Sequence, residues 1–575
     1  MSRTKGAVRT SQLITTYGVG SMVALSDESF VIAGLDLWPQ RDSDEIHEPR
    51  LERVLGVNRF FRPPSSERRE DVPVARFPTW YSCPSCNRLD QWRQFGTPFG
   101  EKATCPFCDD SPELVPSRFV VACDHSHLDD FPYFRWVHQD QLHPKSDERA
   151  KLFIASKGAT SGLRDIEIRC GCGARRSMEG AFSKTALQKF GTCSGLRPWL
   201  PDDKPKSCNA DRRVLQRGAT NVWFSITRSA LSIPPWSERA FRALDRHWTI
   251  VRAVPPDILP LVLNNLNLGD DEFSVEDLVA AVLERLRDDE ATAAKASIEE
   301  EEYEALIRNR PERHRDQTFV CVPAKDVDPS LHQWLPLVQQ VRRLRLVQAL
   351  TGFTRLRSDN GATERVGALT ETAVDWLPAI EINGEGVFLQ LEGEALTEWE
   401  HRPTVVRRVA TLAGRYAESC LRLGAPLAVA VTPRLVLAHS IAHALIDQWS
   451  LEAGYPTAAL SERLYVGDRM AGILIYTATS DSAGSLGGLV SMTEQSRLET
   501  SLAEALDRAS WCGQDPLCIE SDSHGVDALN LAACHSCLLV PETCCTHANT
   551  FLDRALLVGT DEEPELAYFR AMIGR

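Results

Sequence analysis

The sequence predicts a multidomain α+β protein with a cysteine-rich, zinc-ribbon-like insert and a mixed helical C-terminal domain that carries a zinc knuckle. Three observations lead to this prediction. The length of 575 residues corresponds to roughly three or four domains of ordinary size. Most of the 17 cysteines fall into three groups with the spacing of structural zinc sites. Helical and strand-like apolar periodicities occur on either side of the cysteine-rich stretch.

Four regions are expected along the chain. Residues 1–76 mix short apolar runs with turns and are predicted to form strands and helices. Residues 77–210 are rich in Cys, Pro, Gly and aromatic residues, so metal binding is expected to supply part of their folding free energy. Residues 211–335 are predicted to be mainly helical, and residues 336–575 to form the C-terminal domain.

The bulk composition favours a cytoplasmic protein. No uncharged apolar run reaches the roughly 18 residues of a membrane span, and the N-terminus lacks the pattern of a signal peptide. In a reducing cytoplasm, clustered cysteines are more often metal ligands than disulfides. The net charge of −15 argues against a surface coated in basic charge, although it leaves room for a local basic groove.

The first cysteine group has the most specific spacing. Two CxxC turns, Ser-Cys-Pro-Ser-Cys and Thr-Cys-Pro-Phe-Cys, contribute Cys83, Cys86, Cys105 and Cys108. Two such turns can bring four thiolates to the corners of a tetrahedron, the geometry that Zn²⁺ prefers. Four thiolates close the coordination shell and leave no site for a catalytic water. A purely structural role is favoured over contact with nucleic acid or protein.

The second group has longer spacings. It consists of Cys170, Cys172, Cys193 and Cys208, and the Gly residues around the first two permit a tight turn. Cys123, His125 and His127 lie nearby in the sequence and could replace one of these ligands. A buried free thiol and hydrogen-bonded loop histidines are the favoured alternative for these three residues.

The third group is C-terminal and offers six thiols for four places. We predict Cys518, Cys534, Cys537 and Cys545 as ligands, with Cys512 as the main rival of Cys545. Adjacent residues do not easily bind one ion together, so one of Cys544 and Cys545 is expected to be spare. The three groups together predict two to three structural Zn²⁺ ions.

Several motifs of catalysis are missing from the sequence. No GxxxxGK[ST] phosphate loop is present, so the chain is not expected to hydrolyse ATP. His439 and His443 have the i, i+4 spacing of a zincin, but Ser440 stands where the catalytic Glu is required, and core histidines are favoured. The Gly-rich stretch at 480–488 could hold a phosphate or form a tight turn. No catalytic residue is predicted.

Basic residues provide candidate contacts with DNA. Residues 340–360 are predicted to form a basic amphipathic helix, and more Arg residues follow near position 405. The alternative for each arginine is a solvated surface side chain that pairs with a neighbouring Glu and does not contact DNA. The candidates are Arg342, Arg343, Arg345, Arg355, Arg357, Arg402, Arg407 and Arg408.

A series of motifs resembles a known family. The C-terminal motifs are, in order, HSIAHALI, LSERLY, GILIYT, DSAGSLGGLV, DPLC, AACHSCLLVPETCC and LDRALL. They resemble the MZB domain, the zinc-binding domain at the C-terminal end of MrfA-type helicases, here without a helicase. RTSQLITTYGVGSMVAL, VACDHSHLDDFPYFRWVH, TGFTRL and INGEGVFL extend the likeness over nearly the whole chain. The chain thus resembles the DrmB-like proteins, the MZB-bearing components of the bacterial anti-phage system DISARM.

The resemblance implies a partnership. DrmB-like proteins bind a separate superfamily 2 helicase, which is DrmA-like, and the complex engages DNA. The family's cysteines correspond to Cys518, Cys534, Cys537 and Cys545, while Cys544 departs from a more usual Ser. The family's Cys…Gly-His run stands here as Cys123…Ser126-His127. The expected role is therefore a non-ATPase, non-catalytic subunit in a heterodimer that binds foreign DNA.

Two rival functions remain open at this point. One is a zinc-dependent nuclease or hydrolase that uses His439, His443 and a nearby carboxylate. The other is a pure scaffold that recruits other defence components and never touches nucleic acid.

Overall fold

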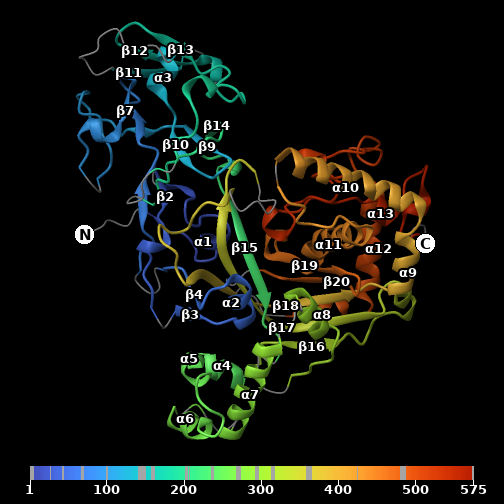
Figure 1. Ribbon diagram of the computed structural model, residues 1–575. Helices are drawn as coiled ribbons and strands as arrows, with labels where there is room; N and C mark the ends of the chain where they lie inside the picture. Colours follow the sequence, from blue (N-terminus) through green and yellow to red (C-terminus); the bar gives the residue numbers. More distant parts are fainter. Residues whose placement is uncertain are drawn as a thin grey trace. The chain divides into compact units, whose positions relative to one another are not determined.

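The chain folds into two compact units, each assembled from separate stretches of sequence. The first comprises Met1–Ile46, Arg59–Arg228 and Ala349–Ile380, and the second His47–Asn58, Ser229–Gln348 and Glu381–Arg575. Figure 1 draws this computed structural model with its helices and strands labelled. The structure describes residues 6–25, 27–41, 44–65, 70–98, 101–139, 151–156, 162–200, 205, 207–234, 239–245, 247–266, 268, 274–291, 297–312, 317–357, 365–423, 425–478 and 487–572.

Small antiparallel sheets build most of the first unit. One has the order β1-β2-β5, a second β10-β9-β14, and a third β13-β12-β11-β7-β6-β8, while β3 pairs with β4. The short helices α1 (Gln12–Thr15) and α3 (Tyr133–His138) accompany them. The strands are β1 (Met22–Leu25), β2 (Glu28–Ile32), β3 (Glu45–Ile46), β4 (Arg59–Phe61), β5 (Val74–Arg76), β6 (Trp80–Ser82), β7 (Arg88–Gln91), β8 (Val115–Pro116), β9 (Phe119–Cys123), β10 (Leu128–Asp130), β11 (Leu152–Ser156), β12 (Ile166–Cys170), β13 (Arg175–Ser177) and β14 (Arg212–Gln216).

A larger sheet forms the base of the second unit. Its strands follow the order β15-β17-β18-β20-β19, and β16 (Val320–Pro323) pairs with β17. Strands β15 (Phe224–Leu231), β17 (Leu337–Thr354) and β18 (Trp376–Gln390) have residues in both units. The hairpin of β19 (Leu460–Gly467) and β20 (Met470–Thr477) contains the β-branched and aromatic residues that favour strands.

Residues 340–354 belong to strand β17, so the predicted basic helix is wrong there, and residues 358–360 lie outside the described residues. Strand β17 is a central strand of its sheet, and its residues are mostly buried on both faces. A strand covered on both faces reads as a nearly continuous apolar run, which periodicity alone cannot distinguish from a helix. The arginines that suggested a solvated face are in part buried, because they bind acceptors inside the protein.

Helix α11 (Pro433–Glu452) lies at the centre of the second unit. Thr432 caps its first turn by accepting a hydrogen bond from the backbone N–H of Leu435, and Pro433 occupies the first helical position. Most of its residues are buried, as expected for a helix that is apolar on all sides. Figure 1 shows it between α10 and the β19–β20 hairpin. The other helices of this core are α9 (Gly393–Glu400), α10 (Pro403–Leu423), α12 (Arg497–Ser510) and α13 (Ala555–Val558).

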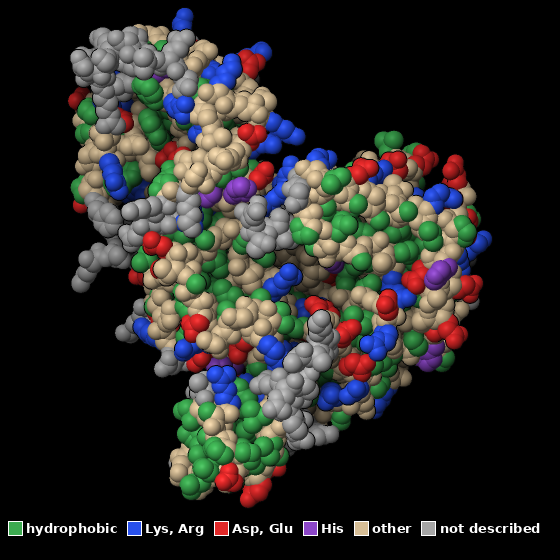
Figure 2. Space-filling model, in the orientation of Figure 1, with side chains coloured by type: hydrophobic (Ala, Val, Ile, Leu, Met, Phe, Trp, Pro, Cys, Tyr) green, Lys and Arg blue, Asp and Glu red, His purple; other side chains and the backbone are tan. Residues whose placement is uncertain are grey.

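A separate helical cluster also belongs to the second unit. Helices α4 (Arg239–Asp245), α5 (Trp248–Val251), α6 (Leu259–Asn265) and α7 (Val275–Ala291) share a small core of their own. Figure 2 shows many apolar side chains on the surface where Figure 1 draws this cluster. Ile250 and Leu261 are among its exposed residues. The unit also contains α2 (Pro49–Leu55) and α8 (Ile298–Leu306).

The predicted combination of α and β structure with clustered cysteines is confirmed. Among the helices of the described residues, none is both long and apolar enough to cross a membrane.

Candidate functional site

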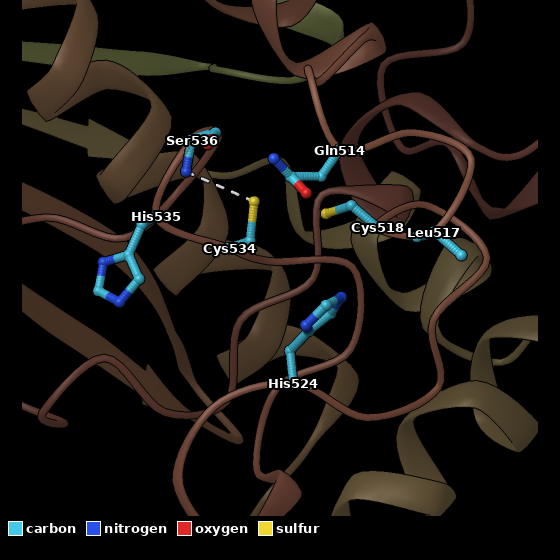
Figure 3. Close-up of a pocket in the computed structure, with 7 residues that line it drawn as sticks. All are labelled: Gln514, Leu517, Cys518, His524, Cys534, His535 and Ser536. Carbon is cyan, nitrogen blue, oxygen red and sulfur yellow. Dashed lines mark hydrogen bonds between the residues drawn. The ribbon is translucent and has the colours of Figure 1, made fainter.

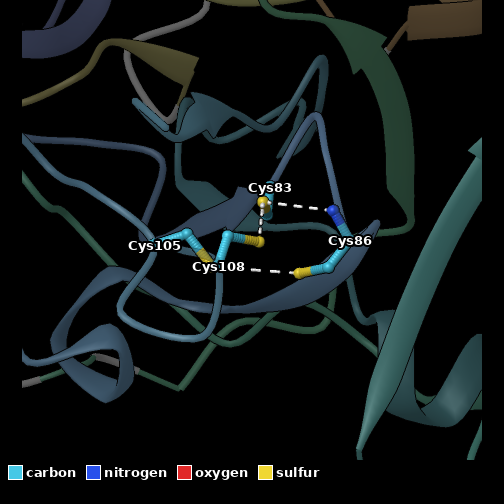
Figure 4. A group of neighbouring side chains, drawn as sticks. All are labelled: Cys83, Cys86, Cys105 and Cys108. Carbon is cyan, nitrogen blue, oxygen red and sulfur yellow. Dashed lines mark hydrogen bonds between the residues drawn. The ribbon is translucent and has the colours of Figure 1, made fainter. Parts of the chain in front are cut away.

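The first cysteine group comes together as predicted. Cys83 and Cys86 lie on the turn between β6 and β7, and Cys105 and Cys108 lie on a second turn opposite it (Figure 4). The Sγ atoms of Cys83 and Cys108 are 3.7 Å apart, and those of Cys86 and Cys105 are 3.8 Å apart. Four sulfurs about 2.3 Å from one Zn²⁺ ion would be about 3.8 Å from one another. This group therefore fits a closed tetrahedral zinc site.

Backbone donors favour the thiolate form at this turn. The N–H of Cys86 donates to Sγ of Cys83 at 3.4 Å. Burial opposes ionisation of Cys83, but the N–H groups of Cys86 and Ser85 outweigh it and lower the pKa of this thiol. Because thiolate is the ligand form, the turn is prepared for a metal ion.

The C-terminal group contains Cys512 in place of Cys545. Sγ of Cys512 lies 3.5 Å from Sγ of Cys534, and Sγ of Cys518 lies 3.8 Å from Sγ of Cys537. The four donors of this C-terminal knuckle, Cys512, Cys518, Cys534 and Cys537, lie within 4.8 Å of one another. Cys545, which the sequence analysis placed here, lies in another cluster, and the rival Cys512 takes its position. Cys544 belongs to no cluster within the described residues and directs its Sγ to the carbonyl oxygen of Thr457.

An open pocket lies beside this C-terminal knuckle (Figure 3). Its volume is about 410 Å³, and the knuckle residues Cys518 and Cys534 line it together with Gln514 and His524. In Figure 3 the sulfur of Cys518 points toward that of Cys534, whereas the ring of His535 points away from both. The ring of His535 is therefore not a fifth ligand.

The structure divides the second predicted group. Cys193 and Cys208 lie with Cys123 and His127, and all four donor atoms are within 4.8 Å of one another. Sγ of Cys123 is 3.4 Å from Nδ1 of His127, close to the roughly 3.5 Å expected between N and S ligands of a tetrahedral Zn²⁺ ion. A hydrogen bond from the Cys123 thiol lowers the pKa of Cys193 to about 4. His125 lies at the edge of the group, with Nδ1 3.4 Å from Sγ of Cys208.

Cys170 and Cys172 lie with His138 at the end of β12. Nε2 of His138 is 3.4 Å from Sγ of Cys172, and its Nδ1 donates to the carbonyl oxygen of Phe134 at 2.8 Å. That bond makes Nε2 the ring nitrogen that faces the thiols. The described residues contribute three donors to this group.

A further cluster contains the two zincin-spaced histidines. His439, His443, Glu462 and Cys545 place their donor atoms within 4.8 Å of one another. His439, His443 and Glu462 have no exposed surface. The i, i+4 spacing indicated that the two imidazoles share a helix face, but the nearby carboxylate and thiol come from distant parts of the chain.

The predicted DNA-contact arginines are dispersed, and several are buried. Arg355 is 1% exposed and donates to the carbonyl oxygens of Ser126, Val222 and Gly20 at 3.0, 2.6 and 2.6 Å. Arg345 is 7% exposed and pairs with Glu381 at 2.7 Å. These two guanidinium groups stabilise the interior, because buried charges require such partners.

The other six arginines are less buried. Arg343, Arg407 and Arg408 form ion pairs with Glu312, Glu563 and Asp553. Arg342 donates to the side-chain oxygen of Gln340, and Arg402 to the carbonyl oxygen of Glu565. Arg357 is partly buried and lies three residues beyond the end of β17. The five arginines between residues 342 and 357 do not lie on the basic helix that the sequence predicted. The Gly-rich stretch at 480–488 lies outside the described residues, except for Gly487 and Gly488.

Two family models match the chain. Residues 9–224 match a domain of unknown function (DUF8724), and residues 441–538 match the MrfA Zn-binding domain. A curated relative from Bacillus paralicheniformis (strain ATCC 9945a / NCIMB 11709 / CD-2), the DISARM protein DrmB, is 31% identical over 568 residues. The alignment covers 95% of this chain and 99% of the relative.

Proposed function

Because the chain belongs to the family of the DISARM protein DrmB, we propose that it acts in DISARM anti-phage defence as the non-ATPase partner of a superfamily 2 helicase. The observation that carries this proposal is the similarity to DrmB along almost the whole length of both chains. The helicase is DrmA-like, and DNA is engaged through the complex. The sequence supports a role in which the helicase, and not this chain, binds ATP, because the chain contains no GxxxxGK[ST] phosphate loop.

The geometry of the metal-binding groups supports a structural role for bound Zn²⁺ ions. We assign Zn²⁺ to the two four-cysteine groups, at Cys83–Cys108 and Cys512–Cys537, and to the Cys123 group. Each set closes the coordination shell with thiolates or with thiolates and one imidazole, which leaves no position for a reactive water. The ions would hold short, loop-rich segments that bury too little apolar surface to fold alone.

The C-terminal knuckle offers a surface for the helicase. Trp511 and Leu517, which adjoin ligands Cys512 and Cys518, are 72% and 76% exposed. Tryptophan is enriched in protein interfaces, and exposed apolar side chains that lie together mark interaction sites. The neighbouring Arg508 is paired with Asp447, so a protein partner is favoured over a phosphate backbone at this surface.

Reconstitution with a DrmA-like superfamily 2 helicase would test the proposal. We expect the two proteins to form a complex, and the complex to bind labelled DNA more tightly than the helicase alone. The double variant Trp511→Ala, Leu517→Ser should reduce the retained helicase at least tenfold. Leu421→Ser is the matched control, because Leu421 is 83% exposed and lies on α10, a different segment of the chain.

The outcomes of this reconstitution distinguish the proposed function from the scaffold and nuclease alternatives. A complex whose affinity for DNA equals that of the helicase alone would favour the scaffold function. Metal-dependent cleavage of labelled DNA by the isolated chain would contradict the non-catalytic role and favour the nuclease.

A further inference from the structure

Four side chains from three separate segments of the chain meet on one side of α11. His439 and His443 lie one turn apart on this helix, Glu462 lies on strand β19, and Cys545 follows the Pro541–Cys544 turn. Their donor atoms are within 4.8 Å of one another. The match to the MrfA Zn-binding domain covers residues 441–538 and so excludes His439 and Cys545.

The tautomer of His443 directs a lone pair into the cluster. Nδ1 of His443 is 2.9 Å from the carbonyl oxygen of Leu538, which can only accept, so Nδ1 carries the proton. Nε2 is then an acceptor, and it lies 3.6 Å from Oε2 of Glu462, a second acceptor. Both atoms are buried and make no hydrogen bond. Two buried acceptors that face one another without a proton between them are expected where a cation binds both.

His439 and Cys545 complete a tetrahedral donor set. Nε2 of His439 lies 3.1 Å from both Sγ of Cys545 and Oε1 of Glu462. Ligands of one tetrahedral Zn²⁺ ion would be about 3.3 Å apart for N and O and about 3.5 Å apart for N and S. The observed separations need only small adjustments to reach these values.

Backbone donors support a thiolate at Cys545. The N–H groups of His547 and Asn549 donate to its Sγ at 3.3 and 3.2 Å. Comparable N–H···S bonds reach Cys83 at the first cysteine group and Cys534 at the C-terminal knuckle. Cys545 therefore has the surroundings of a metal-binding thiol, whereas Cys544 beside it directs its Sγ to a carbonyl oxygen.

Charge balance also requires a cation. A carboxylate and a thiolate side by side in the interior would be strongly unfavourable without a partner. One Zn²⁺ ion with two neutral imidazoles, one carboxylate and one thiolate gives a site of zero net charge. A mixture of N, O and S donors suits the borderline softness of Zn²⁺.

We propose that His439, His443, Glu462 and Cys545 form a closed, structural Zn²⁺ site that fastens α11 to β19 and to the C-terminal loop. All four coordination positions are occupied by the protein. Three of the four ligand side chains have no exposed surface, so neither a substrate nor a reactive water has a place at the ion. The two histidines thus have a structural role in place of the catalytic one that a zincin spacing suggests.

Zinc content of the purified full chain tests this assignment. Inductively coupled plasma and native mass spectrometry should find one Zn²⁺ ion fewer in Cys545→Ala than in the parent chain. Cys544→Ala, a change of the same size at the adjacent residue, should retain the full content. An unchanged content in folded Cys545→Ala would overturn the proposal and would leave a hydrogen-bonded His–Glu network.

A second measurement uses the unaltered chain, in case the variant fails to fold. Crystals measured on both sides of the zinc absorption edge should show an anomalous peak between Nε2 of His439 and Sγ of Cys545. Peaks at the cysteine groups with none at this position would overturn the proposal. Because the readout is metal content, it does not depend on whether the chain binds a helicase.

Discussion

Nδ1 of His443 donates a hydrogen bond of 2.9 Å to the carbonyl oxygen of Leu538, the residue that follows knuckle ligand Cys537. The N–H of Leu538 in turn donates to the carbonyl oxygen of Cys534 at 3.1 Å. The C-terminal knuckle and the buried His–Glu–Cys cluster therefore share one stretch of backbone. A change at either metal group is expected to reach the other through this bond.

Loss of the C-terminal knuckle should loosen this shared stretch. Cys537→Ser is expected to lose the knuckle Zn²⁺ ion and to accelerate limited proteolysis between residues 512 and 545 at least tenfold, because metal binding supplies folding free energy there. Mass mapping of the cleavage products would locate the effect. Cys420→Ala is the control, since Cys420 is buried on α10 and belongs to no metal cluster of the described residues. Equal cleavage of the two variants would argue against a metal at the knuckle.

Two neighbouring histidines should differ in their effect on the Cys123 group. His127→Ala removes a donor that lies among Cys123, Cys193 and Cys208, so the variant should lose one Zn²⁺ ion. His125→Ala should retain that ion, although its ring also lies near Cys208. Elemental analysis of both purified variants would distinguish them. Retention of zinc in His127→Ala, with loss in His125→Ala, would contradict this assignment and would show that His125 is the ligand.

Arg355 is expected to be important for stability. Arg355→Met leaves three buried carbonyl oxygens without their donor, so it should lower the free energy of unfolding by about 3 kcal/mol or more. Arg407→Met is the matched control on the surface, where the side chain is 63% exposed and its loss should cost at most about 0.5 kcal/mol. Denaturant unfolding followed by tryptophan fluorescence would measure both. Similar effects of the two changes would contradict the buried role of Arg355.

Asp130 should make the stability of the first unit depend on pH. Burial raises the pKa of Asp130 to about 6, although its carboxylate accepts hydrogen bonds from Thr79. A raised carboxyl pKa means that the folded state binds the proton more tightly than the unfolded state. The contribution to stability is therefore fully present below about pH 4 and is lost as the pH rises to about 6.

Thermal melts across this pH range would measure the effect of Asp130. Asp130→Asn should reduce the loss of stability between pH 4 and 6, because the amide cannot ionise. Asp257→Asn, at an exposed position, should leave the pH profile unchanged. A profile of Asp130→Asn that follows the parent chain would show that another group titrates.

Local spacing predicted the first cysteine group in full, because each CxxC turn fixes its own two thiols and only the pairing of two turns remained to be found. The other groups depend on contacts between distant segments. The sequence favoured Cys545 over its rival Cys512 as a partner of Cys534, but in the structure Cys512, which follows α12, lies beside Cys534, and Cys545 lies beside His439 of α11. The spacing Cys123-x3-His127 was a signal for the missed imidazole, but nothing in the sequence linked Glu462 to the two histidines of α11.

Periodicity failed at β17 for a physical reason. Arg342, Arg343 and Arg345 interrupt the apolar run at intervals that also fit a helix face. Arg345 pairs with Glu381 inside the protein. A single sequence does not reveal this pairing, so the buried guanidinium was predicted to be exposed to solvent.

Affinity purification of the tagged full chain, expressed together with its gene neighbourhood, tests the central claim most directly. Mass spectrometry of the eluate should find a superfamily 2 helicase in a stoichiometric amount, and the helicase should be lost from the Trp511→Ala, Leu517→Ser variant but retained by Leu421→Ser. Recovery of the chain alone, folded and with its full zinc content, would contradict the proposal that it works as the partner of a helicase.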